Sequence, residues 1–159
     1  LSAAELEANP KLRPIRIRKG ALGRRVPTAD LVVSPQHRIL IRSRIALRMF
    51  DAQEVLVAAK QLCQLEGIDI ATDLAEVSYH HIMFDRHEVV ISNGAETESL
   101  FTGPEALKAV GPAARAEIFA LFPELAAEDY APEAARLLPS GRLGRKLAVR
   151  HLQNGIALQ

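Results

Sequence analysis

Hydrophobic and polar residues alternate in short runs over the first two thirds of the chain, which predicts a mainly β structure. Alternation with a period of two turns one face of a strand toward the core and the other toward solvent. The predicted strands are 14–18, 31–34, 37–49 (with a hairpin bend near Ser43 as an option), 54–57, 77–84, 87–92 and 95–101. Asn93-Gly94 separates the last two, and this dipeptide is a strong signal for a type I′ hairpin.

Helical signals lie at the two ends of the chain. Ser2-Ala3-Ala4-Glu5 has the spacing of a capping box, so a short helix is expected to begin there and to end at Asn9-Pro10. One or two helical turns are predicted over 58–65. After Gly103 the chain becomes rich in Ala, and helical spacing appears in 104–111, 112–121, 131–138 and 141–152. The sequence therefore predicts a β-rich domain over 1–103 and a small helical C-terminal extension over 104–159.

Composition excludes several classes of protein. The chain has 159 residues, of which 48% are hydrophobic and 25% charged, so one domain, or one domain with an appendage, can bury a core. No apolar run approaches the roughly 20 residues that a membrane-spanning helix needs. A single cysteine excludes an internal disulfide framework and a Cys-rich zinc module. Aromatic residues make up only 4%, which weighs against a nucleic-acid surface built on base stacking.

Charge is segregated, although the net charge is only +1. Residues 11–48 contain eleven basic side chains and one acid, whereas residues 51–105 contain eleven acids and two basic side chains. A basic half can bind nucleic acid or an acidic partner. Two simpler explanations are a solvated strand face and mutual neutralisation of the two blocks on adjacent strands. In 37–48 one parity holds Arg38, Arg42, Arg44 and Arg48, and the other holds Ile39, Ile41, Ile45 and Leu47.

Ser34-Pro35-Gln36-His37 is the first candidate for chemistry. It follows an apolar strand, and a hydroxyl and an imidazole three residues apart across a proline turn can converge on one small group. The hydroxyl can hold a carbonyl, and the imidazole can donate to an amide nitrogen or protonate it. A turn with a surface histidine is the structural alternative.

The second candidate is the cluster of His81, Asp85 and His87. On an extended strand these residues share one parity, and a carboxylate beside imidazoles can orient them. A metal site would need a fourth ligand, which the sequence does not offer, and a polar hairpin surface is the alternative. Cys63 lies among apolar residues at helical spacing, which favours a buried, inert thiol over a nucleophile.

Taken together, the two clusters resemble the bacterial Hint-type (Hedgehog/intein) domain. The resemblance rests on Pro14-Ile15-Arg16-Ile17, Gly20-Ala21-Leu22-Gly23, Asp30 to Leu40 with Ser-Pro-Gln-His, Tyr79-x-His81-Ile82-x-x-Asp85-Arg86-His87-Glu88-Val89, Asn93-Gly94, Glu98-Ser99 and Leu138-Pro139-Ser140-Gly141-Arg142. These motifs cover most of the chain in the family's order. The resemblance implies a horseshoe-like β fold that rearranges a peptide bond of its own polypeptide.

In that family a Cys or Ser at the start of the domain attacks the preceding carbonyl, which is an N-to-S or N-to-O acyl shift. The resemblance assigns scissile-amide activation to Ser34 and His37, and proton transfer or orientation to His87 with Asp85 and His81. It implies no cofactor, and it leaves open an inhibitory zinc ion between His and Cys side chains. Family members often belong to large secreted bacterial proteins, which implies the same setting here.

Two departures shape the expectation. The family's nucleophile belongs to a β segment upstream of the part matched here, so we expect an incomplete domain that needs that segment or its host polypeptide as a partner. Exposed sheet edges would then favour self-association. Asn93-Gly94 lacks the preceding histidine of a splicing junction, so splicing is not expected. The rival hypotheses are a binding module that uses the arginine-bearing strand face and a degenerate domain of a secreted protein.

Overall fold

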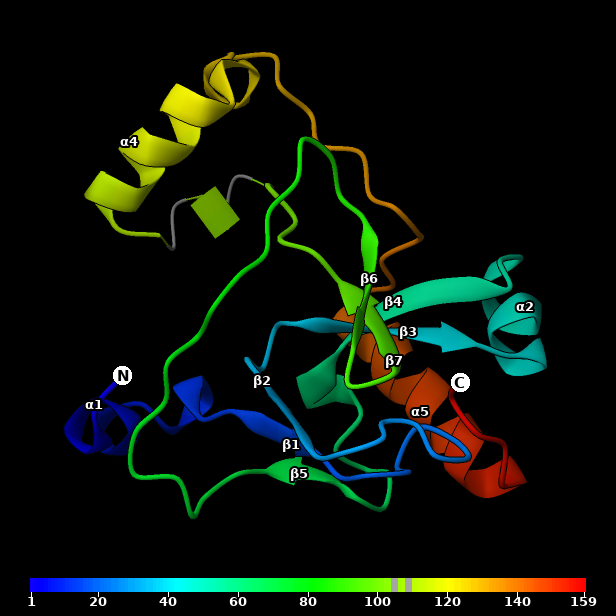
Figure 1. The fold of residues 1–159 in the computed structure, drawn as a ribbon. Coiled ribbons are helices and arrows are strands. Elements are labelled where there is room, and N and C mark those ends of the chain that lie inside the picture. Colours follow the sequence, from blue (N-terminus) through cyan, green and yellow to red (C-terminus); the bar gives the residue numbers. More distant parts are fainter. Residues whose placement is uncertain (104–105, 108–109) are drawn as a thin grey trace. The chain divides into compact units, whose positions relative to one another are not determined.

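Short strands supply most of the regular structure before residue 99, and helices supply most of it afterwards (Figure 1). The computed structural model describes residues 1–103, 106–107 and 110–159. The strands are β1 (Ile15–Ile17), β2 (Leu31–Val33), β3 (Arg38–Arg42), β4 (Glu54–Ala58), β5 (Ile68–Ile70), β6 (Val89–Ser92) and β7 (Ala95–Glu98). The α-helices are α1 (Ala3–Ala8), α2 (Arg44–Phe50), α4 (Pro112–Leu121) and α5 (Gly141–Asn154), and the 3-10 helices are η1 (Pro10–Leu12), η2 (Ala59–Gln61) and η3 (Pro123–Ala126).

The strands form two antiparallel sheets. One has the order β2-β1-β5 and the other the order β4-β3-β7-β6. The β3–β4 ladder is the longest, running from Arg38 opposite Ala58 to Arg42 opposite Glu54. β3 and β7 pair at Ile39 and Thr97. The structure is therefore mainly β with a helical C-terminal part, as predicted.

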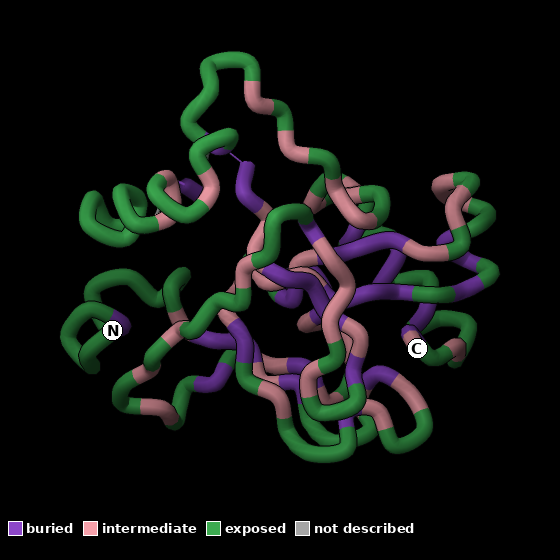
Figure 2. Tube along the Cα trace, turned by 45° about the horizontal axis from the view of Figure 1, so that its top comes forward, coloured by how far each residue is buried: buried purple, intermediate pink, exposed green. Residues whose placement is uncertain are grey.

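The chain divides into two compact units. The sheet unit comprises Leu1–His80, Val89–Glu98 and Arg136–Gln159, and the second unit comprises His81–Glu88 and Ser99–Ala135. Both sheets and α5 share the core of the sheet unit, where apolar residues are buried as purple segments in Figure 2. Its fully buried members include Ile17, Ile39, Ile41, Val55 and Leu147.

The prediction of one long alternating strand over 37–49 is wrong in its second half. The strand ends at Arg42, and α2 begins at Arg44 because the Ser43 hydroxyl caps it by accepting the Ala46 N–H at 3.0 Å. Leu40, which shares the parity of the arginines, is fully buried, so both faces of β3 contribute to the core. Since Arg44 and Arg48 lie on α2, the strand face of four arginines does not exist.

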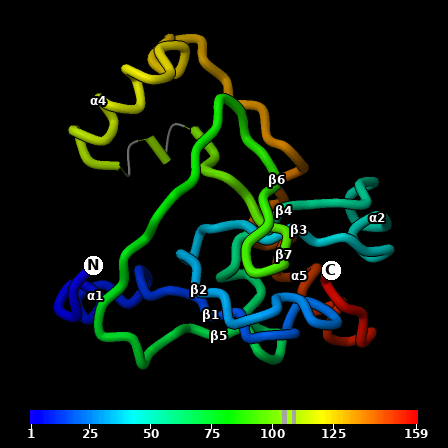
Figure 3. Tube along the Cα trace, viewed as in Figure 1, coloured from blue at the N-terminus to red at the C-terminus, as the bar shows by residue number. Residues whose placement is uncertain are grey.

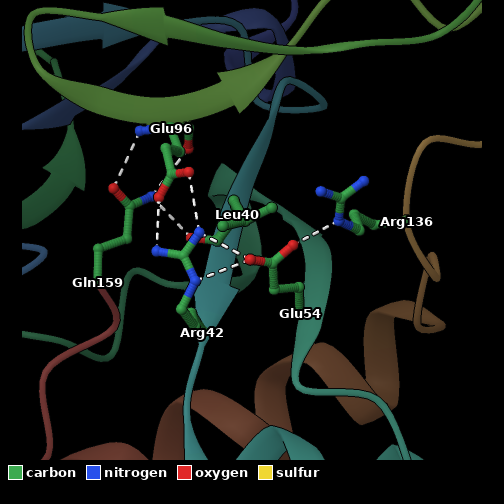
Figure 4. A network of polar contacts seen from close by, with 6 residues as sticks. All are labelled: Leu40, Arg42, Glu54, Glu96, Arg136 and Gln159. Atoms are coloured by element: carbon green, nitrogen blue, oxygen red, sulfur yellow. Dashed lines mark hydrogen bonds and ion pairs between the residues drawn. The ribbon is translucent and has the colours of Figure 1, made fainter.

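The remaining strand arginines are paired with acids from the second charge block. Arg42 contacts Glu54 on β4 and Glu96 on β7, and Glu54 also pairs with Arg136 (Figure 4). Hydrogen bonds from Arg136 and Arg42 lower the pKa of Glu54. Arg38 pairs with the buried carboxylate of Glu98 at 3.0 Å. Mutual neutralisation of the two charge blocks on adjacent strands is confirmed for these arginines.

The C-terminal segment is tied into the same sheet (Figure 4). The side-chain amide of Gln159 donates to the carbonyls of Leu40 and Glu96 at 2.7 and 2.8 Å, and its oxygen accepts the Glu96 N–H at 2.9 Å. The Leu22 carbonyl accepts the backbone N–H groups of Leu158 and Gln159. The side-chain amide of Gln159 thus forms hydrogen bonds with β7 that the backbone of a neighbouring strand would otherwise form.

Among the other predicted elements, some are confirmed and some are wrong. The capping box of α1 and the Asn93-Gly94 hairpin are confirmed. The strand predicted over 77–84 is wrong, because the ribbon between β5 and β6 has no strand there (Figure 1). Figure 3 follows the path of this segment from β5 to β6. The helix predicted over 131–138 is also wrong, whereas those over 112–121 and 141–152 are confirmed as α4 and α5. The helix predicted over 104–111 includes residues outside the described ones.

The second unit contains α4, η3 and the segments that flank them. Backbone hydrogen bonds join Glu88 to Ser99 and Ile82 to Leu100. The hydroxyls of Thr102 and Tyr130 lie 2.7 Å apart, within hydrogen-bond distance. None of the residues of α4 is buried. Among the residues that the structure describes, no helix combines the length and the apolar character needed to cross a membrane.

Candidate functional site

Ser34 and His37 are brought together by a tight turn between β2 and β3. The His37 N–H donates to the Ser34 carbonyl at 3.0 Å, which closes a four-residue turn around Pro35-Gln36. Proline at the second position of this turn fixes the backbone angle that the turn requires. The turn therefore holds the hydroxyl-bearing and imidazole-bearing residues of the first candidate at its two ends.

The turn is fixed to the segment that follows β4. The Ala59 N–H donates to the His37 carbonyl at 2.9 Å, and the Lys60 N–H donates to the Pro35 carbonyl at 3.1 Å. Ser34 and His37 are both partly buried, and the Nε2 atom of His37 is itself buried. Hydrogen bonds at Pro35 and His37 thus fix the backbone of the turn, and a fixed backbone limits the positions that the imidazole can take.

A partly buried ion pair between Arg38 and Glu98 lies next to His37 in the chain. Glu98 accepts the backbone N–H of Arg38 at 2.8 Å and its guanidinium at 3.0 Å, and only 6% of Glu98 is exposed. Glu98 thus fixes the residue directly after His37. The sequence offered Arg38 only as a member of a basic face. The signal that could have identified the pair is the position of Glu98 on the return strand of the Asn93-Gly94 hairpin.

His87 is the buried member of the second candidate cluster. Its Nδ1 accepts the backbone N–H of Ala135 at 3.0 Å, and its ring lies 5.0 Å from the Phe101 ring at an interplanar angle of 58°. Only 7% of His87 is exposed. These contacts lie within the second unit and hold the imidazole in one orientation.

The other two members of the cluster differ from His87 in burial. His81 and Asp85 are exposed, whereas His87 is buried. The three do not share a strand face, because 77–84 is not a strand. Ser34 and His37 belong to the sheet unit, whereas His81, Asp85 and His87 belong to the second unit.

Cys63 has the character of a structural thiol. It is half-buried, its Sγ lies 3.9 Å from the Ala59 carbonyl, and burial raises the pKa of the thiol. A raised pKa lowers the thiolate fraction at neutral pH and hence the reactivity. Within the described part of the chain, no group of three His, Cys, Asp or Glu side chains is placed to hold a metal ion.

His151 is a buried histidine to which the sequence assigned no role. Its Nδ1 lies 2.9 Å from the Ile156 carbonyl, which can only accept, so Nδ1 carries the proton. Nε2 then accepts the Ser43 hydroxyl at 2.9 Å. Burial lowers the pKa of His151, and the backbone contacts of Ile156 and Ala157 oppose that shift. Spacing could not reveal this pair, because its members lie 108 residues apart.

The fold and the turn define a mainly β domain with a Ser-x-x-His turn between two strands. The family model for the Hint domain matches residues 1–104, which include this turn, His87 and the Asn93-Gly94 hairpin. The chain belongs to the Hint family. No curated protein and no solved structure matches the chain.

Proposed function

We propose that the chain acts in autoprocessing: it cleaves a peptide bond of its own polypeptide by an N-to-S or N-to-O acyl shift. The observation that carries the proposal is the Ser34–His37 turn, pinned by backbone hydrogen bonds within a Hint-family domain. The family is generally associated with such autoprocessing, and a hydroxyl and an imidazole carried by a fixed backbone turn suit the activation of one amide.

In the proposed step, a thiol or hydroxyl gives its proton to solvent and attacks the preceding carbonyl carbon. A C–S or C–O bond forms, the C–N bond breaks, and the nitrogen becomes a free amine after gaining a proton. We assign that proton to His37, while Ser34 holds the peptide. His87 assists by orientation or proton transfer, and Asp85 and His81 stay candidates for the same assistance. Water or an added thiol then cleaves the ester or thioester.

The proposal places the attacking residue upstream of residue 1, so the partner of this chain is the polypeptide that precedes it. Cys63 is not assigned this role because the raised pKa of its half-buried thiol disfavours the thiolate. Without the upstream segment, the chain is expected to be inactive, and its exposed sheet edges are expected to favour self-association.

The test joins residues 1–159 to the polypeptide that its gene encodes upstream and follows the intact mass with and without dithiothreitol. The proposal expects a break at an upstream Cys or Ser, and thiol acceleration if the nucleophile is Cys. Ser34→Ala and His37→Ala should both slow the break. A folded, monomeric fusion that keeps its full mass would contradict the proposal, as would undiminished cleavage in His37→Ala.

A further inference from the structure

Exposed basic side chains gather on two neighbouring helices of the sheet unit, α5 and α2. The hydroxyl of Ser43, which caps α2, lies 2.9 Å from Nε2 of His151 in the last turn of α5, so the two helices lie against each other. Neither helix contains an acidic residue. We name their six exposed bases the basic helix surface: Arg44 and Arg48 on α2, and Arg142, Arg145, Lys146 and Arg150 on α5.

The charges of the basic helix surface are not neutralised within the molecule. Across the part of the chain that the structure describes, none of the six bases forms an ion pair with a carboxylate. Arg145 donates to the side-chain oxygen of Gln61 at 2.7 Å, and this partner is uncharged. Arg42, directly before Ser43, is instead paired with two glutamates. The two helices therefore present a net positive charge to whatever meets them.

The positions of these bases are unfavourable for the helices that carry them. Arg44 and Arg142 lie in the first turns of α2 and α5, where the positive end of the helix dipole disfavours a cation. Lys146 lies four residues from both Arg142 and Arg150, and like charges at this spacing repel each other. Helix stability therefore does not explain the bases, whereas contact with an anionic partner would.

Apolar side chains are exposed beside the bases on the same two helices. Leu143, Val149 and Leu152 of α5 expose 40%, 37% and 53% of their surface, and Leu47 of α2 exposes 46%. Each of the first two follows or precedes an arginine in the sequence. The phosphates of a nucleic acid would satisfy the bases alone. An anionic lipid surface offers phosphates to the bases and an apolar layer to the leucines.

We propose that the basic helix surface binds the anionic phospholipid headgroups of a membrane, with the bases on the lipid phosphates and the exposed apolar side chains of α5 and α2 against the layer beneath. Clusters of four to eight Lys or Arg residues on an amphipathic helix are typical of binding to acidic lipids. The helices lie on the membrane in this arrangement and do not cross it. The inference goes beyond autoprocessing, since it requires neither the upstream segment nor cleavage.

The test measures sedimentation of the 159-residue chain with sucrose-loaded vesicles at low and high salt. We expect binding to equimolar phosphatidylcholine and phosphatidylglycerol, and little binding to phosphatidylcholine alone. Salt should weaken the binding because mobile ions screen the attraction. No binding to the anionic vesicles at low salt would overturn the inference, as would equal binding to both kinds of vesicle.

A double variant, Arg142→Gln with Lys146→Gln, tests the surface itself. Glutamine keeps the helix propensity, and the loss of like charges should leave the melting temperature unchanged or higher. The partition coefficient on anionic vesicles should fall roughly 25-fold, from about fivefold for each base. The matched control is Lys11→Gln with Lys19→Gln, which removes two exposed bases outside the helices and should have a much smaller effect. Equal losses in the two double variants would overturn the assignment to this surface.

Two further variants keep the inference testable if that double variant does not fold. Arg44→Gln with Arg48→Gln removes the bases of α2 and should also weaken binding to anionic vesicles. Leu152→Gln should weaken it severalfold, because the leucine no longer contacts the apolar layer. Unchanged vesicle binding in Leu152→Gln would overturn the lipid assignment. Tighter binding to a short DNA duplex than to vesicles at equal phosphate concentration would overturn it as well.

Discussion

The Ser34–His37 turn and the His87 segment hold their imidazoles by different means. The turn lies between two strands, and hydrogen bonds from Ala59 and Lys60 fix its backbone. His87 depends on Ala135, 48 residues further along the chain, and on the ring of Phe101. In the first case the backbone restrains the residue, whereas in the second distant groups restrain the side chain. Substitutions near His37 should therefore change the cleavage rate or the stability of the whole sheet unit. Substitutions near His87 should affect only the residues around it.

The largest expected effect comes from the loss of the His37 imidazole. His37→Ala should slow cleavage of the fusion by about 10²–10⁴-fold, since a positioned proton donor typically contributes that much. His80→Ala is the control because His80 is exposed and has no proposed role in the reaction, and it should leave the rate nearly unchanged. Cleavage rates come from intact mass over time. Equal losses in the two variants would remove the distinction between a held and an exposed imidazole.

The next effect concerns packing in the sheet unit. A Cβ at Gly23 would lie 2.1 Å from the carbonyl oxygen of Gln159, so Gly23→Ala must displace the C-terminal segment. We expect the free energy of unfolding to fall by about 1–3 kcal/mol, the usual cost of overpacking. Gly111→Ala, in the second unit, meets no atom within 4 Å and should change stability little. Urea unfolding measures the free energy of unfolding of both variants. A Gly23→Ala protein as stable as the unsubstituted protein would contradict the close contact between Gly23 and Gln159.

The buried histidine of the sheet unit should give stability a pH dependence. The pKa of His151 is lowered in the folded state, so the unfolded chain takes up a proton first, near the unperturbed value of about 6.5. The free energy of unfolding should therefore fall as the pH decreases below about 6.5, and the loss should level off below the folded pKa. In His151→Gln this decrease should be smaller. Urea unfolding of both proteins at several pH values tests the sign, and an equal decrease in both would exclude His151 as its source.

The smallest effect concerns the ion pairs. Arg42→Ala removes contacts with Glu54 and Glu96 in the sheet unit and should cost about 1 kcal/mol or less, because these side chains are partly exposed. Arg86→Ala removes the more exposed pair with Glu88 in the second unit and should change nothing measurable. Thermal unfolding in low and high salt compares the two. A larger loss of stability in Arg86→Ala than in Arg42→Ala would contradict this prediction.

Local signals predicted the parts of the fold whose residues interact with near neighbours. The capping box, the turn at Ser34 and the Asn93-Gly94 hairpin each depend on a few consecutive residues. The strand β5 was missed because three residues carry no periodic signal and its partner β1 lies far back in the chain. Alternation led to a wrong prediction for 44–49, because Ile45 and Ala46 belong to a helix that begins where Ser43 caps it.

The candidate site, like the fold, was predictable only where its residues lie close together in the sequence. The Ser34–His37 turn is a local feature and could be identified from four residues. The contacts of Glu98 with Arg38 and of Ala135 with His87 join distant segments. The Asn93-Gly94 hairpin gives a signal for the first contact, whereas no spacing rule reveals the second. Apolar and aromatic residues in 77–84 favoured a strand. A strand needs a continuous ladder of backbone hydrogen bonds, whereas the described residues give this segment only isolated ones, between Val77 and Leu1 and between Ile82 and Leu100. For this reason the strand-face argument for His81 and Asp85 failed.

The most direct test of the account is the mass of the N-terminal fragment released from the fusion in dithiothreitol. An acyl shift at Cys leaves a thioester that exchanges with the added thiol, so the account predicts a fragment that carries dithiothreitol at its C-terminal carbonyl before hydrolysis. The same fragment should be strongly reduced in His37→Ala. A fragment that never carries the thiol adduct and is released equally by the His37→Ala protein would contradict autoprocessing by this domain.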